Sequence, residues 1–434
     1  MAYLYNLAYL VAIILASPLL IISSIRKGKY RQGWGAKLFG IVPRSRNDKP
    51  CIWLHAVSVG EVNLLQPILA EISKKHPDWE CVISTTTLTG MDLAQRKYSQ
   101  YTVFYCPLDF SWAVANAFRR VNPAMLVLVE LEVWPNIIRS AHKRGCPVVI
   151  ANGRLSERSF AGYKKISFLI RQTMKRISAV AAQNKDYANR FVSLGVNPSR
   201  VHITGSIKFD GAQTNRSNET TQSLISLSGL NPDMPVILAG STQIEEEKFV
   251  IQTFSDLLPD HPEIQLIIVP RHPERFDAVA EMLEDQIYPW VRRSEITEPL
   301  ADGSWKILLV DVIGELGAWW GTADIALVGG SFGKRGGQNM IEPAAYGAAV
   351  CFGPSTRNFR DVVQQLLNAK AAVVVQDQLE LTEFMRTCLQ DQAFAEDLGT
   401  RAKTLVSEQL GATTQTIDIL AKAMANSQQI NSTL

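Results

Sequence analysis

The chain has 434 residues, of which 47% are apolar and 20% are charged. This length and composition exclude a largely disordered protein and predict two domains, each with its own core. The net charge of +3 is unevenly spread, because residues 1–47 carry seven basic side chains and no acidic one. The other residues hold 37 basic and 41 acidic side chains, a net charge of −4. The basic residues of the first segment are Arg26, Lys27, Lys29, Arg31, Lys37, Arg44 and Arg46.

A basic segment confined to one end of a chain favours an anionic membrane surface as partner and disfavours nucleic acid. The six cysteines lie far apart and form no CxxC pair. This usage indicates a reducing compartment and predicts neither disulfides nor a metal site.

The N-terminus is predicted to be a membrane anchor. Residues 1–25 contain no charged side chain, and the stretch from Leu7 to Ile22 is almost entirely apolar. Its length is about that needed to cross a hydrocarbon core of ~30 Å. Positive charges begin at Arg26, after the apolar stretch, which predicts a single membrane anchor with the rest of the chain on the cytoplasmic side. The alternative is a buried or interfacial helix, because Pro18 interrupts the apolar run.

Beyond the basic segment, short Val- and Ile-rich runs alternate with amphipathic stretches in two successive arrays, as in parallel sheets covered by helices. The expected strands are 51–58, 80–87, 102–109, 124–132, 146–153 and 177–184, then 235–240, 264–270, 306–311, 324–330, 348–353 and 371–376. Residues 213–222 include no apolar side chain and mark the junction between the two domains. We therefore predict an α/β protein of two doubly wound, Rossmann-like domains, residues 26–212 and 223–434, after an anchor at 1–25.

Carboxylates follow two strands of the first array. In AVSVGE, Gly60 permits a turn and Glu61 begins a helix, where it could act as a general base or simply complement the helix dipole. In VELEVWPN, Glu130 and Glu132 fall on one strand face by the period of two. Arg154 and Lys208 are candidate partners, and a structural ion pair is as compatible with this spacing as a functional site.

The second array carries features suited to a nucleotide. AGST at 239–242 is a weak anion-binding turn, and VPRHPERF places Arg271 at a strand end. The segment 329–347, GGSFGKRGGQNMIEPAAYG, joins a glycine-rich loop with two cations to a helix. There Asn339 and Glu342 fall on one face, where the glutamate could accept ribose hydroxyls. A loop with a capped helix is the alternative.

Together these segments resemble the 3-deoxy-D-manno-octulosonic acid (Kdo) transferase family of lipopolysaccharide assembly, over nearly the whole chain. The matching motifs are AVSVGE, ELEVWPN, ANGRLSERS, GSIKFD, VPRHPERF, IGELG, GGSF and GGQNMIEPAAYG. The resemblance implies the two-domain GT-B architecture and an inverting, metal-independent transfer. The donor would be CMP-Kdo, and the acceptor the 6′-hydroxyl of the tetra-acylated lipid A precursor, lipid IVA.

The resemblance also implies residue roles. Glu61 would be the general base, while Lys208 and a carboxylate of the Glu130/Glu132 pair, with Glu132 preferred, would support the transition state. The residues implied at the CMP site are Pro270, Arg271, Ile313, Gly314, Glu315, Asn339, Met340, Ile341 and Glu342. The sequence departs from the family's expected Ala-Ser-(Val or Ile)-Gly-Glu at Ser58, which affects the role of Ser58 and not that of Glu61. Two other hypotheses are a GT-B enzyme that uses a UDP-sugar and a lipid-linked acceptor, and a membrane-tethered nucleotide-binding scaffold without turnover.

Overall fold

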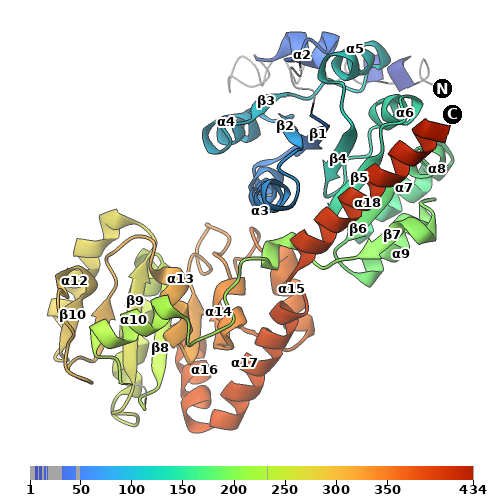
Figure 1. The fold of residues 1–434 in the computed structure, drawn as a ribbon. Helices are drawn as coiled ribbons and strands as arrows, with labels where there is room; N and C mark the ends of the chain where they lie inside the picture. The colour runs from blue at the N-terminus through green and yellow to red at the C-terminus, as the bar shows by residue number, and fades with distance from the viewer. Residues whose placement is uncertain are drawn as a thin grey trace. The chain divides into compact units, whose positions relative to one another are not determined.

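The computed structural model describes residues 5–7, 9–11, 14–15, 17, 32–44, 49–231 and 233–433 (Figure 1). The chain divides into two compact units, unit 1 formed by Met1–Asp210 with Gln409–Leu434 and unit 2 formed by Gly211–Glu408. The membrane anchor predicted over residues 1–25 lies mostly outside the described residues. Among the residues that are described, no helix combines the length and the apolar character needed to cross a bilayer.

Unit 1 is built on a seven-stranded parallel sheet with the order β3-β2-β1-β4-β5-β6-β7. Its strands are β1 (Cys51–His55), β2 (Glu80–Thr85), β3 (Thr102–Tyr105), β4 (Met125–Val129), β5 (Val148–Gly153), β6 (Ala179–Ala182) and β7 (Val201–Ile203). Its helices are α2 (Trp34–Phe39), α3 (Val59–Lys75), α4 (Leu88–Lys97), α5 (Ser111–Val121), α6 (Pro135–Lys143), α7 (Glu157–Lys165), α8 (Ser167–Met174), α9 (Lys185–Ser193), η1 (Pro198–Arg200), η2 (Ile207–Phe209) and α18 (Ala412–Thr433).

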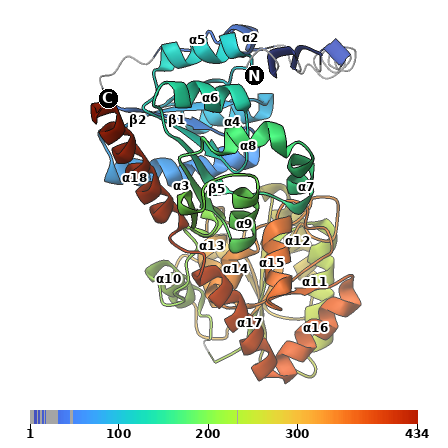
Figure 2. The same cartoon turned by 90° about the vertical axis from the view of Figure 1, so that its right-hand side faces the viewer.

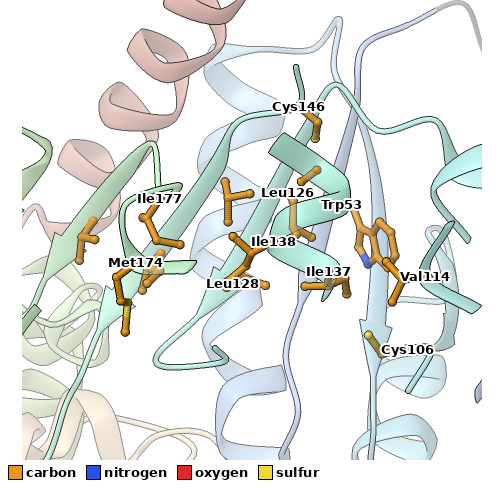
Figure 3. Close-up of a cluster of buried hydrophobic side chains, with 14 of the residues drawn as sticks. Trp53, Cys106, Val114, Leu126, Leu128, Ile137, Ile138, Cys146, Met174 and Ile177 are labelled. Atoms are coloured by element: carbon orange, nitrogen blue, oxygen red, sulfur yellow. The ribbon is translucent and has the colours of Figure 1, made fainter. Parts of the chain in front are cut away.

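Helices cover both faces of this sheet. Successive residues of a strand point to opposite faces, and alternate residues of the central strands lie in two different cores. Trp53 and Leu126 belong to the core beneath α5, α6 and α8, which Figure 3 shows in close-up. Leu54 and Val127, one position along, belong to the core beneath α3 and α18. This double burial explains why the strands read as unbroken apolar runs in the sequence.

The C-terminal helix α18 belongs to unit 1, although it follows unit 2 in the chain. Ile417, Leu420 and Met424 of α18 are buried in the same core as α3, and Figure 2 shows α18 running beside α3. The sequence analysis placed residues 223–434 in one domain. The difference arises because an amphipathic helix reveals that it has a buried face but not which core receives that face.

Unit 2 has a second seven-stranded parallel sheet, ordered β10-β11-β9-β8-β12-β13-β14. Its strands are β8 (Val236–Thr242), β9 (Gln265–Pro270), β10 (Trp290–Arg292), β11 (Ile307–Leu309), β12 (Ile325–Val328), β13 (Ala349–Phe352) and β14 (Val373–Val374). Its helices are α10 (Glu219–Ser228), α11 (Ile244–Leu257), η3 (Pro273–Arg275), α12 (Phe276–Glu284), η4 (Arg293–Glu295), α13 (Leu316–Trp319), η5 (Trp320–Thr322), α14 (Ile341–Tyr346), α15 (Arg360–Asn368), α16 (Gln378–Gln390) and α17 (Gln392–Ser407).

The predicted α/β class with two doubly wound sheets is confirmed, since each unit has a parallel sheet covered by helices and each of the twelve expected segments overlaps a strand. The sequence analysis missed β7 and β10, which lie at sheet edges and have three residues each. Runs this short give too few alternations to be recognised as strands.

Candidate active site

The middle of the unit 1 sheet brings two sequence motifs to one edge. β1 and β4 are parallel neighbours, so the segments that follow His55 and Val129 leave the sheet at the same carboxyl edge. The first segment leads into α3 and the second into α6. Open parallel sheets bind ligands at this edge, so residues of the two motifs can share one site.

Glu61 lies in the first turn of α3, where its carboxylate is held at both oxygens. The backbone N–H of Val57 donates to Oε2 at 2.8 Å, and the Ser58 hydroxyl donates to Oε1 at 2.8 Å. Ser58 is the N-cap residue of the helix. Burial raises the pKa of Glu61, while the bonds from Val57 and Ser58 oppose that rise. A carboxylate that is fixed in position and made more basic by burial fits a general base.

Glu130 and Glu132 lie beyond the end of β4, so the prediction that they share a strand face is wrong. Glu130 has a φ of 60°, a left-handed conformation that costs energy in a residue with a side chain. Its carboxylate pairs with Arg154 at 3.8 Å and with Lys208 at 3.7 Å. Lys208 therefore pairs with Glu130, whereas Glu132 bonds to Trp134.

Glu132 has a different environment from Glu130. Its Oε2 accepts a hydrogen bond of 2.6 Å from the indole N–H of Trp134. Burial raises the pKa of Glu132 to about 7, and the negative charge of Glu61 raises it further, against the Trp134 bond. Near neutral pH this carboxyl is therefore held close to its point of half-protonation.

The three carboxylates share a cavity of about 230 Å³. Glu61, Glu130 and Glu132 line it together with Leu131, Arg154, Ser156, Ser159 and Tyr163. The structure thus brings Glu61 and Glu132 together. Lys208 lies beside them because it forms an ion pair with Glu130. A hydroxyl group placed in this cavity would meet a base, a cation and a half-protonated acid within one small volume.

Glu132→Gln is expected to stabilise the protein at about pH 8 by on the order of 2 kcal/mol and to have little effect at about pH 4.5. The pKa of Glu132 is higher in the folded than in the unfolded state. The folded protein therefore binds more protons between these two pKa values, and its stability falls as the pH rises through that window. The amide of Gln removes the need to hold a second charge beside Glu61. Thermal midpoints measured at both pH values test this, and an equal shift at both would contradict it.

In unit 2, the predicted pair Asn339 and Glu342 forms at the start of α14. The Asn339 amide donates to Oε1 of Glu342 at 2.9 Å. Burial raises the pKa of Glu342, whereas Asn339, Trp320 and the charge of Arg271 oppose that rise. Arg271 follows the last residue of β9 and is exposed. These residues form a partly open polar site at the carboxyl edge of the unit 2 sheet.

The other predicted nucleotide contacts have different environments. Pro270 ends β9, and Met340 and Ile341 are buried, so they contribute backbone groups and packing. Ile313 is exposed, and Gly314 has a φ of 98°. The carboxylate of Glu315 is held in place by surrounding donors, the guanidinium of Arg293 at 2.8 and 2.9 Å and the indole N–H of Trp319 at 3.1 Å.

Glu246, which the sequence analysis did not single out, holds the start of the glycine-rich loop. Its buried carboxylate accepts hydrogen bonds from the backbone N–H groups of Gln243, Gly330, Ser331 and Phe332, at 2.7 to 3.0 Å. The signal was present as a glutamate three residues after the helix N-cap Gln243, the spacing of a capping box. That pattern predicts the bond from Gln243. It does not predict the three bonds from the glycine-rich loop, which lies about 85 residues further along the chain.

Comparisons with known proteins identify relatives of this chain. The family described as 3-Deoxy-D-manno-octulosonic-acid transferase (kdotransferase) matches residues 32–211. A 3-deoxy-D-manno-octulosonic acid transferase from Haemophilus influenzae is 31% identical, over 96% of this chain and 98% of that protein. One from Bordetella pertussis is 30% identical, over 85% and 86% of the two chains.

The fold has a counterpart among solved structures. Acinetobacter baumannii MurG matches with a TM-score of 0.56 at 13% identity, over 86% of this chain and 99% of that one. Two parallel α/β units with a carboxylate cluster at one sheet edge, taken with these relatives, define a glycosyltransferase of the two-Rossmann-domain class. Within that class, the chain belongs to the 3-deoxy-D-manno-octulosonic acid transferase family.

Proposed function

We propose that this enzyme transfers Kdo from CMP-Kdo to the 6′-hydroxyl of the tetra-acylated lipid A precursor, with inversion at the anomeric carbon and without a metal ion. The observation that supports this most directly is the fixed, half-buried carboxylate of Glu61, which lines a cavity together with Glu130 and Glu132. Such a cavity suits activation of a hydroxyl acceptor.

In the proposed step, Glu61 takes the proton of the acceptor hydroxyl as its oxygen bonds to the anomeric carbon. The bond from that carbon to the CMP phosphate breaks, and its electron pair leaves with CMP. Lys208 and Arg154, held beside Glu130, keep positive charge near the cavity. A leaving group with one phosphate carries less negative charge than one with two, so cations and backbone N–H groups can stabilise it without a divalent ion.

The donor would bind in unit 2. Glu342 accepts a hydrogen bond from Asn339 and is partly exposed, so its carboxylate can also accept hydrogen bonds from ribose hydroxyls. Arg271 lies near enough to lower the pKa of Glu342 and suits the phosphate of CMP. Lys334 and Arg335 of the glycine-rich loop are exposed and make no ion pair with a described residue.

Attachment to the cytoplasmic face of an inner membrane is also part of the proposal. Large apolar side chains are exposed near the N-terminus of unit 1, which fits contact with lipid. They are Leu7, Leu10, Val11, Ile14, Leu15, Trp34, Phe39 and Ile41. The seven basic residues between Arg26 and Arg46 would strengthen contact with anionic head groups, by about 1 kcal/mol each before screening.

Two measurements test the proposed function. Incubation with CMP-Kdo and lipid A precursor is expected to increase the acceptor mass by Kdo, with EDTA having no effect. CMP, and not UDP, is expected to raise the thermal midpoint of the protein. Protection by UDP alone would favour a UDP-sugar donor, and protection by CMP without any transfer would favour a scaffold.

Glu342→Ala is expected to weaken CMP binding, with little effect on the thermal midpoint of the ligand-free protein. The ligand-free protein holds this carboxylate partly buried beside Asn339, so its loss removes a desolvation cost together with the Asn339 hydrogen bond. Calorimetric titration with CMP measures the effect, and Glu281→Ala on the exposed side of α12 is the control. A large fall in the thermal midpoint would assign Glu342 a structural role instead.

A further inference from the structure

A second buried polar cluster lies in unit 1, outside the carboxylate cavity. Asn6, Asp109 and Asn136 are each less than a tenth exposed, and they come from the N-terminal segment, the loop before α5 and the first turn of α6. Asn6 bonds to Ser111 at the start of α5 and to Asn136 at the start of α6. A buried charge in such a place needs several partners to offset its desolvation.

Asp109 bonds to two separate parts of the chain. Its Oδ2 and Oδ1 accept from the backbone N–H groups of Asn136 and Ile137, at 2.9 and 2.8 Å, which caps α6. Its Oδ2 also accepts from the hydroxyl of Tyr9 at 3.0 Å. The N-cap residue of α6, Trp134, provides no side-chain cap of its own. Asp109 therefore links the N-terminal segment to the start of α6.

Asn6 reinforces this link. Its side-chain amide exchanges two hydrogen bonds with Ser111, accepting from the backbone N–H at 2.9 Å and donating to the hydroxyl at 2.8 Å. Its carbonyl oxygen also accepts from the side-chain amide of Asn136 at 3.3 Å. The N-terminal segment thus contacts the first turns of both α5 and α6.

The start of α6 is directly connected to the cavity. The helix begins at Pro135, and the residue before it is Trp134. The indole N–H of Trp134 donates to Glu132. A chain of contacts therefore runs from Tyr9 through Asp109 and α6 to Glu132. A shift of the α6 terminus would move the Glu132 loop with it.

The outward side of the N-terminal segment is apolar. Asn6 and Tyr9 make contacts with the body of unit 1, while Leu7, Leu10 and Val11 are 58%, 48% and 46% exposed. A helix packed on a soluble protein has the opposite pattern, with its apolar side inward. Together with the basic residues between Arg26 and Arg46, this pattern fits a segment that contacts lipid hydrocarbon while its polar side is held by protein.

We propose that Asp109 is a positioning residue that ties the lipid-contacting segment, residues 5–7 and 9–11, to the loop carrying Glu132. The carboxylate cavity then keeps a fixed position relative to the lipid surface from which the acceptor comes. This inference rests on the proposed function, because it assumes an acceptor embedded in lipid. A helix cap without such a role would affect stability alone.

Tyr9→Phe tests the proposal, because it removes only the hydroxyl that reaches Asp109 and leaves the cap of α6 intact. Transfer to acceptor embedded in vesicles of phosphatidylglycerol and phosphatidylethanolamine is expected to fall by roughly tenfold, the effect of losing one hydrogen bond to a charged group. Transfer to acceptor dispersed in detergent, and the affinity for CMP, are expected to stay unchanged. Tyr5→Phe is the matched control, since the Tyr5 hydroxyl bonds to the backbone carbonyl of Leu169 and not to the Asp109 cluster of described residues.

Asp109→Asn is the second variant, and it is expected to show the same difference between vesicles and detergent, with a lower thermal midpoint. Equal loss in vesicles and in detergent would overturn the proposal and leave Asp109 as a helix cap. Unchanged vesicle activity of Tyr9→Phe would also overturn it. If the unmodified enzyme transfers no Kdo in vesicles or in detergent, the proposed function itself fails. That outcome differs from a failure of the proposal on Asp109, which concerns the variants alone.

Discussion

Glu61→Gln is expected to lower the rate of Kdo transfer by roughly 10²–10⁴-fold, the usual contribution of a general base. The amide has the size of the carboxylate and can still accept from the Val57 N–H, so the fold and the affinity for CMP should be retained. It cannot take a proton from the acceptor hydroxyl. Single-turnover assays with saturating CMP-Kdo measure the chemical step apart from binding.

The control for this experiment is Glu219→Gln, which changes an exposed glutamate in the first turn of α10 in the same way. It should leave the transfer rate unchanged. Substantial activity of Glu61→Gln at neutral pH would assign the proton transfer to another group, and Glu132 would be the next candidate because it lines the same cavity.

The two sheets could be predicted because the local signal and the tertiary structure agree. A strand buried on both faces, such as β4 (Met125–Val129), is a continuous apolar run in the sequence, whereas a surface strand or helix alternates apolar with polar residues. The carboxylates could be located for the same reason, since motifs after parallel neighbouring strands must end at one edge of the sheet. The neighbour relation of β1 and β4 itself came only from the structure.

Pairing within the site could not be predicted from spacing. The period of two requires a strand that continues to residue 132, whereas the positive φ of Glu130 changes the direction of the chain one residue after β4. This turn gives Glu130 both cations, Arg154 and Lys208, and leaves Glu132 with Trp134. Backbone conformation at one residue thus decides which carboxylate pairs with the two cations.

Long-range polar contacts were beyond the sequence for a similar reason. Asp109 and Asn136 are 27 residues apart, and Asn6 lies 130 residues from Asn136. Each has an ordinary local explanation as a turn or cap residue. Their common burial becomes apparent only when the helices that they join are in place.

Glu246→Ala is expected to have the largest effect on stability, because four backbone N–H groups, two of them in buried bonds and two in partly buried ones, lose their acceptor together. At ~1–3 kcal/mol for each unsatisfied group, and with water able to reach some of them, the loss should be about 4 kcal/mol or more. The loop from Gly330 to Phe332 would no longer be fixed to the start of α11, so CMP affinity should fall as well. Thermal unfolding with and without CMP measures both effects.

Glu245→Ala is the matched control, because Glu245 precedes Glu246 in the first turn of α11 and is exposed. Hydrogen exchange adds a local test, since the amides of Gly330, Ser331 and Phe332 should exchange faster in Glu246→Ala and at the usual rate in Glu245→Ala. Glu246→Gln should fall between them, because its amide oxygen can accept two of the four bonds while its NH₂ group faces the other donors. If the loop amides stay protected in Glu246→Ala, other contacts hold the loop. The bonds of Ser331 to Val328 and Gly353 would then be the ones to examine, because they fix the same loop residue from the strand side.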